Sequence, residues 1–206
     1  MDTDEVLRRW AKRSGAYSPD YYAYYGPNEA SESVRARLDS LAGSNPTVLE
    51  LGCSSGRHLS HLRDHGYEDL YGIDINDEAL DVMEDAYPDL AARGTFYIDA
   101  IENVVADFDD GRFDVVYSVE TLQHLHPDNE WVFEELSRIT DDLLVTVENE
   151  GEEGRRSAEP TVNYVDDDFP LYYRNWNRVF SERGFVEVDS EPVERNTLRA
   201  FRPTRE

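Results

Sequence analysis

The fold of this chain is decided by residues 48–56, which read VLELGCSSG. A short apolar run ends in a turn of small residues, and the amphipathic residues that come next predict a helix. Gly52 lets the backbone approach a ligand, and Gly56 allows close passage at the start of that helix. An ordinary strand–helix turn has a similar composition, but Glu50 argues against it because a buried carboxylate needs a partner. The stretch therefore predicts a ligand site at the carboxyl end of this strand.

Short β-branched runs alternate with amphipathic stretches along the rest of the chain, which is typical of strand–helix–strand units. The expected strands are Thr47–Leu51, Leu70–Asp74, Thr95–Ile98, Asp114–Val119, Leu143–Glu148, Phe185–Asp189 and Thr197–Arg202. The expected helices are Ser54–His65, Asp77–Tyr87 with Asn76 or Asp77 as its N-cap, Asn129–Arg138 and Tyr173–Arg183. The connection Glu191–Asn196 is too short for a crossover, so the last two strands form an antiparallel pair. The sequence predicts an α/β fold: a seven-stranded, mostly parallel sheet with helices on both faces and an antiparallel last strand.

Two segments stand outside this scheme. Residues 1–41 are expected to form an N-terminal helical cap, and residues 150–170 form a polar insertion within the main domain, residues 42–206. Both segments are candidates for a lid over an active site. The residues expected in the lid are Tyr17, Tyr21, Tyr22, Tyr25 and Tyr173. In the alternative interpretation, the tyrosines only pack a helical cap against the edge of the sheet.

The chain of 206 residues carries 45 acids against 20 bases, a formal net charge of −25. Nineteen of the bases are Arg and only Lys12 is Lys, while the acids are spread along the chain. Because the Debye length is only ~3 Å at 1 M salt, such repulsion is screened in multimolar salt. A basic partner would favour a clustered acidic run instead. The composition therefore predicts a halophilic protein from a salt-adapted, haloarchaeal-type proteome.

The single cysteine and the hydropathy pattern bear on location. Cys53 excludes an intramolecular disulfide and fits a reducing compartment. No apolar run approaches the ~18 residues that a membrane span needs, and the first residues have no signal-peptide pattern. We expect a cytoplasmic protein without a membrane span.

The glycine pattern separates two kinds of nucleotide site. A G-x-G-x-x-G dinucleotide site needs glycines at 52, 54 and 57, where this chain has Gly52, Ser54 and Arg57. Residues 50–56, ELGCSSG, instead resemble the E/D-x-G-x-G-x-G motif of class I S-adenosylmethionine-dependent methyltransferases, with Ser54 replacing the middle glycine. The resemblance is to methyltransferase domains of the type 11 and type 25 kind and spans roughly residues 45–203. It implies a Rossmann-like transferase with S-adenosylmethionine as cofactor and S-adenosylhomocysteine as product.

The same resemblance implies a set of cofactor residues. Asp74 is expected to bind the ribose hydroxyls with Ile75 against the adenine, and Asp99 to accept from the adenine amino group. Taken alone, each acid is also a common helix N-cap. The full set is Glu50, Gly52, Cys53, Ser54, Gly56, Asp74, Ile75, Asp99, Ala100, Ser118 and Val119.

Residues 113–128 resemble a stretch of small-molecule methyltransferases that ends in L-x-H-L-x-D. By this likeness Glu120, His124 and His126 face the methyl-transfer crevice as candidate catalytic residues. His is well tuned as a general base near neutral pH, although a packing role for His124 stays open. These residues lack a recognisable metal-ligand constellation, so no metal is expected.

Residues that several methyltransferase subclasses require are missing. Cytosine-C5 methyltransferases need a nucleophilic cysteine near the fourth strand, whereas Cys53 lies in the cofactor loop. Ribose 2′-O enzymes of the K-D-K-E type need two lysines, and this chain has only Lys12. Enzymes that methylate amide or adenine nitrogens carry N/D-P-P-Y/F after the fourth strand, where residues 118–121 of this chain read SVET. These absences favour a small-molecule, lipid or sugar acceptor, methylated at O or N, over nucleic acid. The alternatives are a non-catalytic methyltransferase-fold binding module, an RNA methyltransferase and an aminopropyltransferase. An anionic acceptor would be indicated if basic residues converged over the crevice, namely Arg8, Arg9, Lys12, Arg13, Arg155, Arg156 and Arg174.

Overall fold

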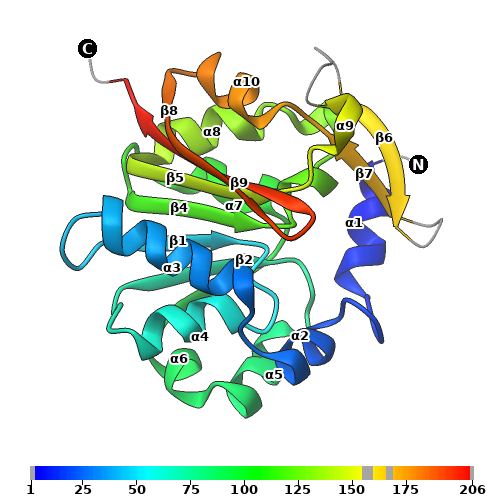
Figure 1. Ribbon diagram of the computed structural model, residues 1–206. Helices are drawn as coiled ribbons and strands as arrows, with labels where there is room; N and C mark the ends of the chain where they lie inside the picture. Colours follow the sequence, from blue (N-terminus) through cyan, green and yellow to red (C-terminus); the bar gives the residue numbers. More distant parts are fainter. Residues whose placement is uncertain (1–2, 155–159, 166–168, 205–206) are drawn as a thin grey trace.

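The structure is a computed structural model that describes residues 3–154, 160–165 and 169–204. Its main sheet has seven strands in the order β3-β2-β1-β4-β5-β9-β8 (Figure 1). The strands are β1 (Val48–Leu51), β2 (Leu70–Asp74), β3 (Thr95–Ile98), β4 (Phe113–Val119), β5 (Thr140–Glu148), β8 (Phe185–Val193) and β9 (Asn196–Pro203). The first five pair in parallel, and β9 is antiparallel to both β5 and β8. The predicted sheet is therefore confirmed.

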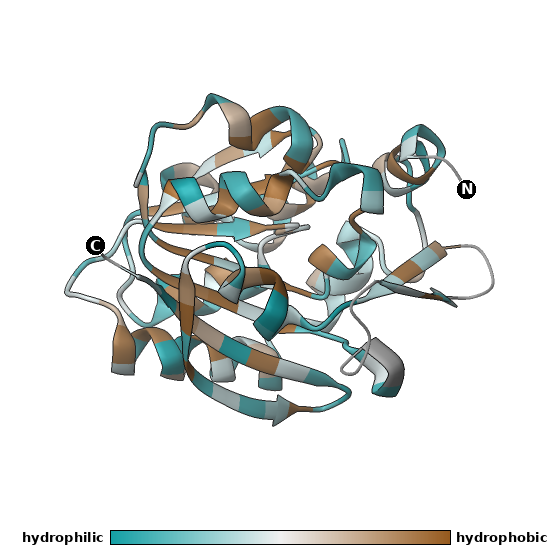
Figure 2. Cartoon of the chain, turned by 90° about the horizontal axis from the view of Figure 1, so that it is seen from above, coloured by the Kyte–Doolittle hydropathy of each residue, from teal (hydrophilic) through white to brown (hydrophobic). Residues whose placement is uncertain are grey.

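Helices cover both faces of this sheet (Figure 1). On one face lie α3 (Glu29–Leu41), α4 (Arg57–Asp64), α5 (Ala79–Ala86) and α6 (Pro88–Arg93). On the other lie α7 (Ile101–Val104), the 3₁₀ turn η1 (Val105–Asp107), α8 (Val132–Ile139) and α10 (Trp176–Ser181). Successive strand residues point to opposite faces, so each face receives its own apolar cluster. Seen from above, hydrophobic segments run along the strands between these layers (Figure 2).

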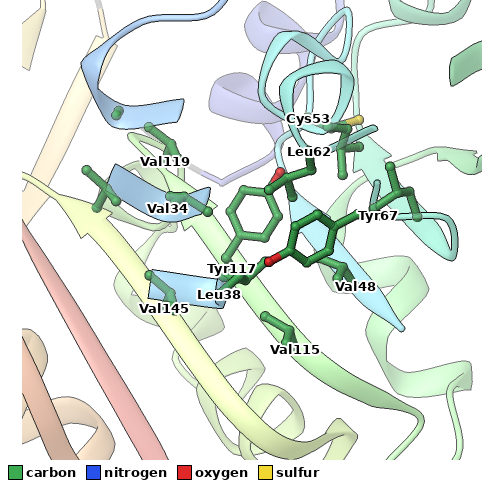
Figure 3. Close-up of a cluster of buried hydrophobic side chains, with 14 of the residues drawn as sticks. Val34, Leu38, Val48, Cys53, Leu62, Tyr67, Val115, Tyr117, Val119 and Val145 are labelled. Carbon is green, nitrogen blue, oxygen red and sulfur yellow. The ribbon is translucent and has the colours of Figure 1, made fainter. Parts of the chain in front are cut away.

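The α3 helix is part of the core. Val34 and Leu38 on α3 pack in the same cluster as Tyr117 of β4 and Leu62 of α4 (Figure 3). Of the predicted cap, residues 1–41, α3 therefore lies within the helical layer. Only α1 (Thr3–Ala11) and α2 (Pro19–Tyr25) remain as separate covering helices.

The predicted insertion contains a small second sheet. This sheet is the antiparallel pair β6 (Thr161–Val165) and β7 (Phe169–Tyr173), and the short helix α9 (Gly151–Gly154) precedes it. The β6–β7 pair lies beside α1 at the right of Figure 1, where the ring of Phe169 contacts that of Trp10 at a centroid distance of 4.6 Å. Both covering segments thus meet at the same end of the main sheet.

Two helices begin later in the chain than the sequence predicts. The helix expected from Ser54 begins at Arg57, because Ser54 and Gly56 have left-handed φ values of 49° and 84°. The next helix begins at Ala79 with Glu78 at its N-cap, and the predicted cap Asn76 accepts a hydrogen bond from the Glu78 N–H. Within the described ranges, no helix has the length and apolar character needed to cross a bilayer.

Candidate active site

A pocket lies at the carboxyl ends of the central parallel strands. β1 and β4 are neighbours whose connections leave toward opposite faces, which is the switch point where open α/β sheets bind ligands. The strand ends supply most of its lining, namely Gly52, Cys53, Ser54, Ile73, Asp74, Ile75, Asn76, Ala100, Ile101, Glu102, Val119, Glu120, Thr121, Leu122, Gln123, His124 and Leu125. Helices and the β8–β9 turn supply the rest, namely Val6, Leu7, Trp10, Arg13, Tyr17, Pro19, Tyr22, Arg57, His58 and Arg195.

The loop after β1 is shaped by its backbone. Gly52 has a φ of 70°, and a Cβ at this position would collide with the side chain of Thr121. Its N–H donates to the Ile73 carbonyl oxygen at 2.8 Å. Ser54 also adopts left-handed backbone and donates its N–H to Asp74 Oδ2 at 2.7 Å. These contacts hold the loop against the end of β2.

Asp74 is oriented by the same contacts. Its Oδ2 accepts from Ser54 and its Oδ1 accepts from the Asn76 N–H at 2.8 Å. Burial raises the pKa of this carboxyl, and the backbone donors oppose the rise. Because a carboxylate oxygen accepts about two hydrogen bonds, each oxygen keeps room for a ribose hydroxyl. Ile75, Ala100 and Ile101 also line the pocket and offer apolar surface suited to a base. Together with Asp74, these residues fit an adenosyl group.

Glu50 lies beneath the loop and outside the pocket lining. It is fully buried, and its Oε2 accepts from the Tyr117 hydroxyl at 2.9 Å. Its Oε1 has no hydrogen-bond partner among the described residues. Burial raises the pKa of this carboxyl well above its usual range.

Asp99 is an exposed residue at the end of β3. Its Oδ1 accepts from the Ala100 N–H at 2.7 Å and from Asn103 Nδ2 at 2.8 Å, at the start of α7. Asp99 does not line the pocket, whereas its neighbour Ala100 does. Its predicted contact with adenine stays a prediction.

A second buried acid, Glu148 at the end of β5, holds the loop after β4. Its Oε1 accepts from Ser118 Oγ at 2.8 Å and from the N–H groups of Thr121 and Leu122 at 3.1 and 3.0 Å, while Oε2 accepts from Gln123 N–H at 3.2 Å. Burial raises the pKa of Glu148 to about 7. Sequence reasoning missed this residue, although an acid ending a hydrophobic strand was the signal used for Glu50.

Glu120 connects the pocket to the β8–β9 turn. It follows β4 with a left-handed φ of 52°. Its Oε1 accepts from Arg195 Nε at 2.9 Å and from Asn196 Nδ2 at 3.0 Å. The Arg195 charge therefore compensates the Glu120 charge within the pocket.

His124 presents one ring nitrogen as an acceptor. Its Nδ1 lies 3.2 Å from the Pro170 carbonyl oxygen, which can only accept, so Nδ1 carries the proton. Nε2 is then unprotonated. Burial lowers the pKa of His124 to about 4, which keeps the ring neutral at pH 7. The Trp10 ring packs edge-on against it at 4.7 Å.

His126 lies elsewhere. Its Nδ1 accepts from the Asp128 N–H at 3.2 Å and its ring packs against Tyr172 at 5.5 Å. Of the three candidate catalytic residues, the fold brings Glu120 and His124 into the pocket, and His126 does not line it.

The N-terminal helices cover the pocket with aromatic side chains. Trp10 and two of the predicted lid residues, Tyr17 and Tyr22, line it. Asn76, from the loop after β2, donates from Nδ2 to the carbonyl oxygens of Trp10 and Arg13 at 3.3 and 3.1 Å. This side chain ties the end of α1 to the sheet.

The other predicted lid and cofactor residues occupy positions outside the lining. Tyr21 and Tyr25 pack on each other at 4.8 Å, and the Tyr173 hydroxyl accepts from Asn163 Nδ2 at 2.8 Å. Ser118 is buried on Glu148. A Cβ at Gly56 would lie 2.7 Å from Leu90 Cδ2, so this glycine permits close packing of α4 on α6.

The basic residues do not converge over the pocket within the described part of the chain. Arg8 and Arg9 pair with Glu5, and Lys12 pairs with Asp77. Arg174 is buried against Glu130, and Arg155 and Arg156 lie outside the described residues. Of the five of these basic residues that the structure describes, only Arg13 lines the pocket.

Two features of the lining escaped sequence reasoning. Trp10 is the aromatic residue of the amphipathic helix α1, and its buried residue Val6 precedes it by four positions. Arg57 directly follows the glycine loop. Among the described residues, no group of His, Cys, Asp and Glu is arranged to hold a metal ion.

Comparison with known proteins agrees with this geometry. Residues 48–142 match the family model described as a methyltransferase domain. The O-antigen chain terminator bifunctional methyltransferase/kinase WbdD of Escherichia coli is 31% identical over 104 residues. These residues are 48% of this chain but only 14% of WbdD, so the chain matches a small part of that relative.

Several solved structures have similar folds. The Burkholderia thailandensis 1,6-didemethyltoxoflavin-N1-methyltransferase, whose structure holds 1,6-didemethyltoxoflavin and S-adenosylhomocysteine, has a TM-score of 0.66 at 17% identity, with 85% of this chain and 77% of that chain covered. A Methanosarcina mazei S-adenosylmethionine-dependent methyltransferase has a TM-score of 0.66 at 16% identity, with 82% and 97% covered. The CcbJ methyltransferase of Streptomyces caelestis has a TM-score of 0.65 at 17% identity, with 87% and 97% covered.

The fold of this chain is that of the class I methyltransferases, as predicted. Together with the domain match at residues 48–142, it supports an S-adenosylmethionine-dependent methyltransferase with S-adenosylmethionine as the cofactor.

Proposed function

We propose that this chain transfers a methyl group from S-adenosylmethionine to an oxygen or nitrogen atom of a small-molecule acceptor. One observation carries the proposal. One side of the pocket carries Asp74 and Ile75, which suit an adenosyl group. The pocket is also lined by the aromatic side chains of Trp10, Tyr17 and Tyr22. A largely apolar pocket that aromatic side chains partly cover suits a small ligand better than a polymer.

The chain's own residues divide into those for the cofactor and those for the acceptor. When bound, S-adenosylmethionine supplies an electrophilic methyl group on its sulfonium. Asp74 would hold the ribose of this cofactor through its two oxygens, while Ile75 and Ala100 would contact the base. The helices α1 and α2 exclude water, and positioning of the acceptor supplies much of the rate in such a reaction. The methionine part is assigned to the loop that carries Gly52 and to Val119.

His124 is the residue proposed to hold the acceptor's proton. Its Nδ1–H is engaged by Pro170, so Nε2 is the nitrogen with an available lone pair. Glu120 is neutralised by Arg195 and is proposed to orient the acceptor. A neutral imidazole of low pKa is a weak base, so its first role is to accept a hydrogen bond from an acceptor hydroxyl or amine.

The comparisons support a small acceptor in one respect. The Burkholderia enzyme of similar fold is named for 1,6-didemethyltoxoflavin, which its structure holds together with S-adenosylhomocysteine. Only the fold carries that likeness, so the acceptor of this chain is assigned by class and not by name. A cytoplasmic, salt-adapted setting is part of the same proposal, supported by the −25 net charge and the single cysteine.

Calorimetry in multimolar KCl tests the proposal. S-adenosylmethionine and S-adenosylhomocysteine are expected to bind and NAD is not. Binding of NAD without the sulfonium pair would overturn the proposal. A panel of hydroxyl- and amine-bearing small molecules, incubated with methyl-labelled cofactor, is then expected to yield a labelled product that short RNA substrates do not.

A further inference from the structure

Glu148 is a buried acid that accepts hydrogen bonds from the end of β4 and from the loop after it. Its side chain is fully buried and does not line the pocket. Oε1 accepts from Ser118 Oγ and from the N–H groups of Thr121 and Leu122. Oε2 accepts from the Gln123 N–H. Among the described residues Glu148 forms no ion pair, so four neutral donors alone face this carboxylate.

The loop that these donors belong to continues into His124. Gln123 and His124 are the last two residues of the 3₁₀ turn η2 (Leu122–His124). Gln123 is held a second time, because its Oε1 accepts from the Asn149 N–H at 2.9 Å. Asn149 directly follows Glu148, so the end of β5 holds both the backbone and the side chain of Gln123. The backbone next to His124 is therefore fixed from one strand end.

The ionised form of Glu148 fits this loop better than the protonated form does. A carboxylate only accepts hydrogen bonds, with about four lone-pair sites, whereas a protonated carboxyl carries an O–H donor of its own. Because four donors already face the two oxygens, a proton on either oxygen weakens at least one of these hydrogen bonds. Burial raises the pKa of Glu148 to about 7. The form that fits the loop is thus costly in this buried place, and it is gained or lost near neutral pH.

Few charged groups act on Glu148. The charge of Arg174 acts on it from the residue after β7, but Arg174 pairs with Glu130. The neighbouring strand β9 places the uncharged Thr197 opposite Glu148. Protonation of Glu148 is therefore governed by its burial and by the four donors. The remaining titratable groups on the loop and at the end of β5 are Glu120, which pairs with Arg195, Glu150, which pairs with Arg199, and His124, which is neutral at pH 7.

We propose that Glu148, as a carboxylate, is a positioning residue that fixes the loop carrying Glu120 and His124 in the pocket. The inference rests on the proposed function, since it assigns Glu148 an effect on the acceptor side of that site. Glu148 acts through the backbone of residues 121–123. A buried charge without a basic partner lowers the stability of the fold, so a purely structural position would be served as well by a neutral side chain.

The test compares Glu148→Gln with Glu150→Gln. Gln has the size of Glu and accepts at one oxygen, but its NH₂ group faces a donor where the second oxygen stood. Glu150 is the matched control, because it is also buried, lies two residues later, and pairs with Arg199 of β9. Glu148→Asp keeps the charge on a shorter side chain. NMR follows the N–H signals of residues 121–123 and the two ring nitrogens of His124 through neutral pH.

In the native protein, the three loop N–H signals are expected to move together with a midpoint near pH 7. The ring signals of His124 should follow the same midpoint, although this ring itself titrates near pH 4. In Glu148→Gln both titrations are absent, and the His124 ring is no longer held as the Nδ1–H tautomer alone. Glu148→Asp should retain a titration, and Glu150→Gln should match the native protein.

Turnover and stability separate a positioning role from a structural one. With the panel compound that takes up the methyl label, kcat of Glu148→Gln is expected to fall by roughly tenfold or more, because a misplaced group near the acceptor slows the reaction. The affinity for S-adenosylhomocysteine should change far less, and Glu148→Asp should recover part of kcat.

The expected stability follows from the raised pKa. Between pH 4.5 and 7 the folded state binds more protons at Glu148 than the unfolded chain does, so the free energy of unfolding falls as the pH rises through this range. Glu148→Gln lacks this fall. Above pH 7 the variant is therefore expected to melt no lower than the native protein, although it has lost turnover.

Loop and His124 signals of the native protein that do not titrate near pH 7 would overturn the inference. Native turnover in Glu148→Gln would do the same, and so would a joint loss of turnover and melting temperature, which marks a structural role. Failure of the proposed function is recognised separately, because the native protein then binds no S-adenosylhomocysteine and no panel compound takes up the label. The NMR measurements need no ligand, so they then decide alone whether Glu148 positions His124.

Discussion

At the scale of single residues, four acids at strand ends have four different surroundings. Asp74 faces the pocket, Asp99 contacts the start of α7, Glu50 accepts from Tyr117, and Glu148 holds the loop after β4. Asp74 and Glu148 end their strands, Asp99 follows one, and Glu50 is the residue before the last of β1. What separates them is which donors the neighbouring elements bring, so one carboxylate faces the pocket while another fixes the backbone of a loop.

Replacing Asp74 by Ala is expected to weaken S-adenosylhomocysteine by about a hundredfold, because two charge-assisted hydrogen bonds to the ribose are lost. Calorimetry measures the affinity. Asp77→Ala is the control, since Asp77 lies three residues away and pairs with Lys12 outside the lining. An unchanged affinity in Asp74→Ala would mean that another residue binds the ribose.

His124 makes a pH prediction with a definite sign. Its pKa is about 4 in the folded protein, against about 6.5 in an unfolded chain. Between these values the unfolded state binds more protons, so His124 lowers the free energy of unfolding as the pH falls from 6.5 to 4. The His124→Gln variant is expected to lose part of this acid sensitivity.

Urea titrations at several pH values measure that difference between the native protein and His124→Gln. Carboxylates also titrate in this range, so only the difference between the two proteins reports on His124. Parallel pH profiles for the two proteins would contradict a neutral, buried ring.

At the scale of elements, α1 is a cover attached through few contacts. Trp10 packs between His124 and Phe169, Asn76 donates to its last turn, and Val6 is its one buried residue. Elements with few buried contacts open at low free-energy cost. The same helix supplies part of the pocket lining, so its attachment and ligand retention are coupled.

Trp10→Ala is expected to cost roughly 2 kcal/mol of the contacts that hold α1, a little less than the loss of a fully buried aromatic side chain. Hydrogen exchange should then speed up in residues 3–16 while β1 and β4 stay protected, and bound S-adenosylhomocysteine should dissociate faster. Trp131→Ala is the matched control, because Trp131 is 42% exposed and outside the pocket. Equal exchange in α1 of the two variants would show that Trp10 does not hold the cover.

At the scale of the whole molecule, the net charge of −25 affects mainly the stability of the folded state. Many arginines are engaged in ion pairs, such as Arg37 with Asp189 and Glu191, and Arg138 with Glu135. The 45 acids outnumber the 20 bases by more than two to one, so ion pairs leave a large excess of negative charge. Their mutual repulsion destabilises the compact state wherever salt does not screen it.

The melting temperature is therefore expected to rise by about 10 °C or more between dilute buffer and roughly 3 M KCl. Scanning calorimetry measures this difference. Potassium acetate at equal ionic strength is the comparison that separates screening from specific binding of chloride. A melting temperature that does not depend on salt would refute the salt-adapted interpretation.

The sequence by itself determined the sheet, its antiparallel end and the glycine loop at its centre. These features depend on local patterns: apolar runs of strand length, a turn of small residues, and a connection too short to cross the sheet. The pattern placed the start of α4 three residues too early, because the left-handed backbone at Ser54 accompanies its hydrogen bond to Asp74, twenty residues away.

Only the tertiary structure decided which polar residues face the pocket. The tautomer of His124 is set by the Pro170 carbonyl oxygen, 46 residues later in the chain. The charge of Glu120 is compensated by Arg195, 75 residues later. Arg57 pairs with no carboxylate of the described chain at salt-bridge distance, although its charge acts on the buried Glu50. The physical reason is common to all three: burial, charge and tautomer depend on neighbours in space, and no spacing within the sequence encodes those neighbours.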